Sequence, residues 1–106
     1  MNHNNINEAI QILEKAREHP IAYIGGKTPD LALAFLNGFN ICLTMTENLG
    51  FEQKDTRNAI ARSQGLQSTS HSRDLRKQGF SEQEIIEKLF TLEIEAWRQL
   101  LKENEG

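Results

Sequence analysis

The stretch PDLALAFLNGFNICLTMTENL, residues Pro29–Leu49, decides the fold that we expect for this chain. At 100° per residue its apolar side chains cover two adjoining faces of a helix. One stripe is polar and consists of Asp30, Asn37, Asn40, Thr44 and Glu47. A helix that is apolar over more than half of its circumference is typical of a protein interior. It is too polar to span a bilayer, which takes about 20 predominantly apolar residues. We therefore expect an all-α bundle with 29–49 as its buried central helix.

The segments before the central helix carry clear boundary signals. Asn5 and Glu8 fit a capping box, which predicts a first helix that runs to Glu18, where His19-Pro20 ends it. Residues 21–24, Ile-Ala-Tyr-Ile, are β-prone without a second strand, so we expect a short extended connector. Thr28 and Pro29 then begin the central helix as N-cap and first-turn residue.

The second half of the chain predicts two more main helices, which makes about four in all. Gly50 is expected to cap the end of the central helix, and a weaker helix follows over 52–63. Residues 65–72 are typical of a loop, and 73–78 of a short helical turn that ends at Gly79. Ser81 to Glu84 is a second capping box, which begins a last helix that runs to Lys102.

Size and composition favour one ordinary domain, 1–106, in the cytoplasm. A chain of 106 residues is near the commonest domain size. Its opening residues lack the apolar core of a signal peptide, and its single cysteine, Cys42, is expected on the buried face of the central helix. One cysteine excludes an internal disulfide and suits a reducing compartment. We expect no membrane association.

The net charge of −3 conceals a basic middle segment, because residues 54–78 hold six basic and two acidic side chains. Within it, Ala61 to Leu66 is similar to the alanine–x–x–x–glycine–hydrophobic turn of helix-turn-helix DNA binders. In that family the second helix docks through apolar residues, and the matching positions here hold His71 and Asp74. Nucleic-acid binding is therefore the alternative function. We prefer the interpretation in which the basic segment lies against acidic helices of the same chain. The candidate contacts are Arg57, Arg62, Arg73, Arg76 and Lys77.

Lys27 is a further candidate for contact with an anion. It lies in Gly25-Gly26-Lys27-Thr28, which resembles the end of the phosphate-binding loop of P-loop nucleotide hydrolases. The motif requires a glycine where this chain has Ile21. We therefore expect at most an incidental anion site there, and no nucleotide cofactor.

Glu93 falls by angle within the apolar face of the last helix. A buried carboxylate needs a partner, so we expect a structural pair with an arginine such as Arg57 or Arg62, or else partial exposure. The alternative is a site residue that faces a cleft. For the polar residues Asn37, Asn40 and Glu47 we expect a hydrogen-bonding seam, with a ligand groove as the alternative.

The chain shows no local catalytic or metal-binding pattern, since His3, His19 and His71 are widely separated and no histidine accompanies Cys42. We therefore expect no catalytic residues, no metal and no cofactor. The large apolar groups of the last helix and the connector, among them Trp97 and Tyr23, exceed what one small bundle should bury. We expect a homodimeric interaction or regulatory protein without catalytic activity, whose protein partner the residues do not identify. The alternative is a monomer with Trp97 in its own core.

Overall fold

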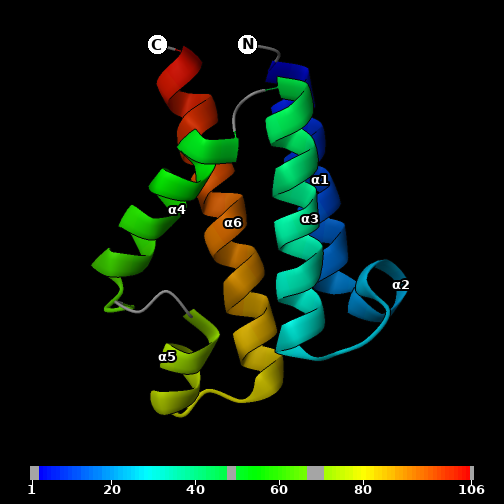
Figure 1. Ribbon diagram of the computed structural model, residues 1–106, viewed down its shortest axis with the longest axis vertical. Helices are drawn as coiled ribbons and strands as arrows, with labels where there is room; N and C mark the ends of the chain where they lie inside the picture. The colour runs from blue at the N-terminus through cyan, green and yellow to red at the C-terminus, as the bar shows by residue number, and fades with distance from the viewer. Residues whose placement is uncertain (1–2, 48–49, 67–70, 106) are drawn as a thin grey trace.

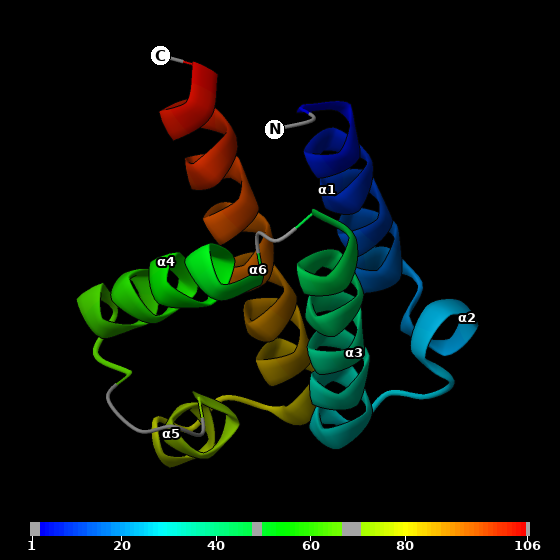
Figure 2. The ribbon, with the colours of Figure 1, turned by 45° about the horizontal axis from the view of Figure 1, so that its top comes forward.

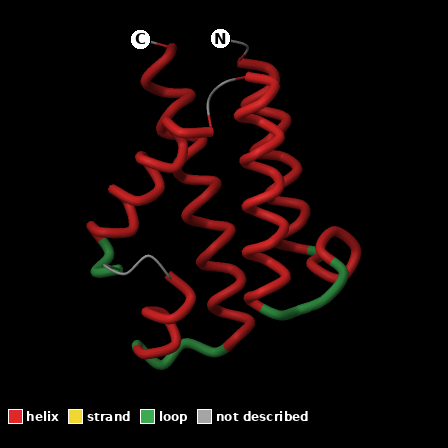
Figure 3. Tube along the Cα trace, in the orientation of Figure 1, coloured by secondary structure: helices red, strands yellow, loops and turns green. Residues whose placement is uncertain are grey.

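The computed structural model describes residues 3–47, 50–66 and 71–105, and this part of the chain forms six helices and no strand (Figures 1 and 3). The helices are α1 (His3–Glu18), α2 (Pro20–Ile24), α3 (Pro29–Glu47), α4 (Gly50–Ser63), α5 (His71–Lys77) and α6 (Glu82–Glu105). The predicted all-α bundle is confirmed.

The central element of the bundle is α6, and the prediction that 29–49 would hold that position is wrong. Helix α6 packs against α1, α3, α4 and α5. In Figures 1 and 2, α1 and α3 lie on one side of α6, while α4 and α5 lie on the other. Its buried side chains include Phe90, Ile94 and Trp97, the last only 1% exposed. Trp97 therefore belongs to the core of its own chain, as the monomer alternative required.

Helix α3 lies at the side of the bundle because only part of its apolar surface faces inward. Ala32 and Leu36 are buried, and Phe35 packs its ring against Phe90 of α6 with ring centroids 5.9 Å apart. Cys42, expected on a buried face, is exposed. A helix that is apolar on nearly all sides does not itself show which side the rest of the chain covers, and this is why the prediction failed.

Residues 21–24 are helical, not extended, which corrects the predicted connector. Pro20 lacks a backbone N–H and has a fixed φ, so it is well suited to the first position of a helix. His19 before it has non-helical backbone angles (φ −131°, ψ 64°) and separates α1 from α2. Helix α2 ends at Gly25, whose φ of 81° is a left-handed conformation that glycine adopts readily.

Several predicted helix ends are confirmed. Leu31 N–H donates to Thr28 Oγ1 at 3.2 Å, the expected N-cap of α3. At the start of α6, Ser81 N–H donates to Glu84 Oε1 at 3.0 Å, and Glu84 N–H donates to Ser81 Oγ at 3.2 Å. This reciprocal pair is the predicted capping box.

Other boundaries differ from the expectation. Helix α1 begins at His3, so Asn5 lies inside it and does not cap it. Gly50 begins α4 and does not cap α3, which ends at Glu47. Glycine is strongly enriched just after helix C-termini and only modestly at helix starts, so Gly50 departs from the usual preference. Helix α5 begins at His71, two residues earlier than predicted.

Candidate functional site

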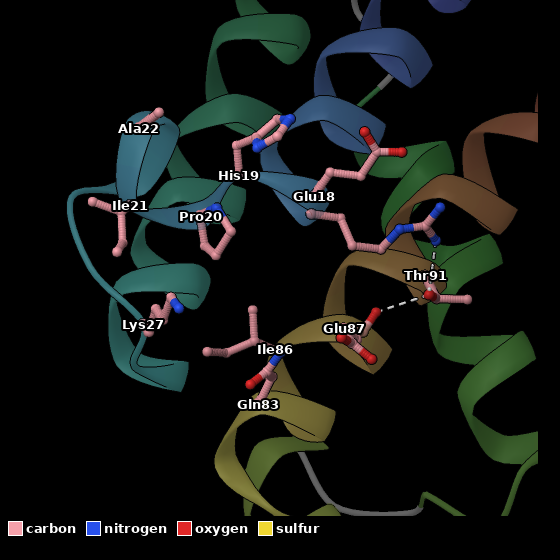
Figure 4. Close-up of a pocket in the computed structure, with 11 residues that line it drawn as sticks. Glu18, His19, Pro20, Ile21, Ala22, Lys27, Gln83, Ile86, Glu87 and Thr91 are labelled. Atoms are coloured by element: carbon pink, nitrogen blue, oxygen red, sulfur yellow. Dashed lines mark hydrogen bonds between the residues drawn. The ribbon is translucent and has the colours of Figure 1, made fainter.

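A cleft with a volume of about 730 Å³ lies between the end of α1, helix α2, the loop before α3 and the first turns of α6 (Figure 4). It forms because α2 packs against α1 and α3, at a distance from the first turns of α6 (Figure 1). Its walls carry both charged and apolar side chains. The lining residues include Arg17, Glu18, Pro20, Lys27, Ile86 and Glu87.

Two cations line this cleft, and neither forms an ion pair with the residues that the structure describes. The partly buried Arg17 donates from Nη1 to Thr91 Oγ1 at 3.0 Å, and Thr91 Oγ1 donates to the backbone oxygen of Glu87 at 2.8 Å. Lys27 is exposed. This predicted anion contact lies on a wall of a cleft that also holds two carboxylates, Glu18 and Glu87.

The buried carboxylate of Glu93 is held by three side chains from two other helices. Asn40 Nδ2 of α3 donates to Glu93 Oε2 at 3.1 Å, and Gln53 Nε2 of α4 donates to the same oxygen. Arg57 Nη1 of α4 donates to Glu93 Oε1 at 2.5 Å. Glu93 is 2% exposed. The predicted ion pair of Glu93 with an arginine is confirmed, with Arg57 as the partner, and Asn40 joins it.

His71, at the start of α5, lies close enough to this cluster for the charges of Arg57 and Glu93 to act on it. Burial lowers the pKa of His71 below its ordinary value of 6.5, and the positive charge of Arg57 lowers it further. Asp74 and Glu93 act in the opposite direction without reversing the shift. The neutral imidazole is therefore favoured in the folded protein.

The outward side of α3 is an exposed apolar face. Its exposed residues recur at helical spacing and include one polar side chain, Asn37, and no charged one after Asp30; the apolar and small residues are Leu31, Ala34, Gly38, Ile41 and Cys42. Ile41 is 60% exposed, and a Cβ placed on Gly38 would meet nothing within 4 Å. A groove of about 300 Å³ between α1 and α3 adjoins this face and includes Cys42 and Ile12. We refer to Leu31, Ala34, Gly38, Ile41 and Cys42 together as the α3 outer face.

The remaining predicted interaction residues do not form one surface. Trp97 is in the core, whereas Tyr23 of α2 is 42% exposed. Asn37 is exposed on α3, away from the Glu93 cluster that Asn40 joins. The side chain of Glu47 lies outside the described residues.

The predicted nucleic-acid contacts are also dispersed. Arg57 is withdrawn into its pair with Glu93. Arg73, Arg76 and Lys77 are exposed on the outward side of α5, and Arg76 lies 3.7 Å from Glu82. Arg62 is exposed at the end of α4.

The motif that is similar to a helix-turn-helix turn has a local explanation. Leu66 N–H donates to the oxygen of Ala61, and Gly65 N–H to that of Arg62, both at 3.0 Å. This is a Schellman cap, with Gly65 in the left-handed conformation (φ 84°) and Leu66 buried. The same arrangement ends α5, where Phe80 N–H donates to the oxygen of Leu75 and Gly79 has a φ of 91°. Alanine, glycine and the following apolar residue are therefore accounted for by helix termination.

Comparison with protein-family models, curated proteins and solved structures gives no match to this chain. Within the described residues, no helix combines the length and apolar character needed to cross a bilayer. The same residues contain no group of three or more histidine, cysteine, aspartate or glutamate side chains arranged to hold a metal ion.

Sequence reasoning missed Gln53 and the cleft. Gln53 is wholly buried although glutamine is usually exposed, and only its position one turn before Arg57 could have indicated that it faces the same carboxylate. The cleft combines residues far apart in the chain, and it depends on α2 being a helix. Because residues 21–24 were expected to be extended, the sequence did not predict the cleft.

Proposed function

We propose that this protein is an interaction protein that acts as a homodimer, with the α3 outer face of each copy packed against that of the other. The observation that supports this most directly is the exposure of this face. Leu31 is 40% and Ile41 60% exposed, on a helix whose residues 31–46 include no charged side chain. Contiguous exposed apolar surface marks sites of association.

The chemistry of the face favours a second copy of this chain as the occupant. A twofold contact places the same patch against itself, so a charged patch would oppose like charges. The α3 outer face avoids this because it is uncharged. Ala34, Gly38 and Cys42 are small residues at four-residue spacing. They would allow two helix axes to approach closely, and the space beside Gly38 is open.

Neighbouring apolar side chains extend the proposed interface. Ile12 of α1 and Tyr23 and Ile21 of α2 are exposed as well. Together with Leu31 and Ile41 they make up the exposed large hydrophobic residues of the described chain, and all of them belong to α1, α2 and α3. The proposed homodimer therefore keeps Tyr23 as an interface residue. Its main contact surface is the α3 outer face and not the apolar residues of α6.

The proposal assigns the protein an interaction or regulatory role without catalysis, in the cytoplasm. Cys42 is exposed before two copies associate, and a reducing compartment would protect its thiol from oxidation at that stage. A protein partner would bind surfaces left outside the dimer contact.

Sedimentation velocity over micromolar to submillimolar concentrations tests the dimer. We expect the wild-type protein to approach twice the 12.1 kDa chain mass, and Ile41→Glu to remain a monomer with unchanged helicity, because the variant would bury two carboxylates in the twofold contact. Ala59→Glu adds the same charge at an exposed position on α4 and should dimerise like the wild type. A wild-type monomer across the whole range, or dimerisation of Ile41→Glu, would refute the proposal.

Nucleic-acid binding is the second candidate, supported by the three basic side chains on the outward side of α5, Arg73, Arg76 and Lys77. Titration of labelled DNA and RNA at low salt, repeated as the salt is raised, tests it, because contacts with phosphate weaken as salt increases. Replacing these three residues by glutamine should abolish such binding. Failure of the wild-type protein to bind at low salt would exclude this candidate.

A further inference from the structure

We propose that the cleft between α1, α2 and α6 binds a small zwitterion whose two opposite charges are separated by an apolar body, such as an ω-amino acid or a dipeptide with free termini. This site is separate from the α3 outer face and does not depend on dimerisation.

The size and floor of the cleft suit a small organic molecule. Its volume of about 730 Å³ falls in the range of roughly 300–1,000 Å³ that is usual for ligand pockets. Ile86, a buried residue of α6, and Pro20, the first residue of α2, supply apolar surface at its centre (Figure 4). An apolar body placed there would cover surface that is otherwise open to water.

The charges of the cleft select the kind of ligand. Lys27 lies across the cleft from Glu18 and Glu87 (Figure 4). Arg17 is held by Thr91 of α6, next to the turn that carries Glu87. The charges of the two cations and two carboxylates sum to zero, but they are unevenly placed. Lys27 makes one side of the cleft positive, and Arg17, Glu18 and Glu87 together make the opposite side negative.

A ligand with a single charge would match one of these sides and leave the other unmatched. A simple anion could approach Lys27 but would gain nothing from Glu18 and Glu87. A zwitterion satisfies both sides at once, because its carboxylate accepts from Lys27 while its ammonium group donates to a carboxylate on the opposite wall, that of Glu87 (Figure 4). Arg17, held at Thr91 on the same side as Glu18 and Glu87, can donate from its guanidinium to a neutral carbonyl in the body of the ligand, such as that of a dipeptide.

Three probes of nearly equal shape test the proposal by titration of ¹⁵N-labelled protein followed by NMR. These are the zwitterion 4-(aminomethyl)benzoate, the anion 4-methylbenzoate and the cation 4-methylbenzylamine. We expect the zwitterion to bind about fivefold more tightly than either of the others, as an additional pair of exposed charges implies. The shifted resonances should be those of residues 17–27 and 83–91.

Variants identify the contribution of each wall. Lys27→Ala should lower the affinity for the zwitterion to that of the cation, whereas Lys54→Ala, an exposed lysine on α4, should leave it unchanged. Ala22→Trp should fill the cleft and abolish binding of all three probes while the far-ultraviolet circular dichroism stays the same. The proposal is overturned if no probe shifts the cleft resonances, if a singly charged probe binds as tightly as the zwitterion, or if the two lysine variants behave alike. The two lysine variants alter neither the α3 outer face nor Ile21 and Tyr23 of α2, so their comparison is independent of the sedimentation experiment.

Discussion

Replacing Arg57 by methionine should destabilise the fold strongly, because it leaves the buried carboxylate of Glu93 without its cation. The two side chains are only 16% and 3% exposed, so water cannot replace the lost partner. Breaking a buried pair by removing one member costs about 3–5 kcal/mol. We expect about 3 kcal/mol, the lower end of that range, because Asn40 and Gln53 continue to donate to Glu93. That is a large part of the 5–15 kcal/mol that is usual for a domain.

Urea denaturation followed by Trp97 fluorescence measures this loss, since Trp97 is the single tryptophan and lies in the core. Arg98→Met is the matched control: Arg98 forms exposed pairs with Glu14 and Glu95, and its loss should cost less than about 1 kcal/mol. The double variant Arg57→Met/Glu93→Gln should recover about 2 kcal/mol relative to Arg57→Met, because a neutral amide oxygen still accepts from Asn40 and Gln53 without a buried charge. Equal losses for Arg57→Met and Arg98→Met would refute the reasoning.

Two further predictions concern the core and the acid response. Leu36→Ala should lower the free energy of unfolding by about 3 kcal/mol in the same urea assay, because it creates a cavity. Phe35→Ala should lower it less, because Phe35 is only half-buried. A larger loss for Phe35→Ala would mean that α3 is rotated about its axis. Because the folded-state pKa of His71 is lowered, the unfolded chain binds its proton more readily, so the stability present above pH 6.5 should fall as the pH drops through the lowered pKa. His71→Gln should reduce this slope on the acid side of pH 6.5, and an unchanged slope would place the acid response elsewhere.

Local chemistry made part of the fold predictable. The Ser81–Glu84 capping box, the Thr28 cap and the glycine at position 79 each act within a few residues, so the sequence alone indicated them correctly. The central helix was not predictable in this way. Both α3 and α6 carry wide apolar arcs, and burial depends on which arc the other helices cover. Ile41 and Ile94 look equivalent by type, yet one is 60% exposed and the other is buried.

The candidate sites show the same limit. Glu93 was identifiable because a charge within an apolar stripe demands a partner, and Arg57 was one of the two arginines proposed for it. The cleft depends on the orientation of α2, which Pro20 sets by beginning a new helix directly after α1. The α3 outer face became visible only once the inward side of α3 was known.

The position of α6 in the order of the helices has a consequence for synthesis. Helices α1, α3 and α4 emerge from the ribosome before the segment against which all three pack. Until residues 82–105 follow, Leu13, Leu36 and Ala61 lack the helix against which their own helices pack, so these apolar helix faces stay uncovered. The bundle should therefore assemble only after the segment up to Trp97 has left the exit tunnel. Chaperones that bind exposed apolar segments would meet this chain in its longest unprotected state immediately before that point.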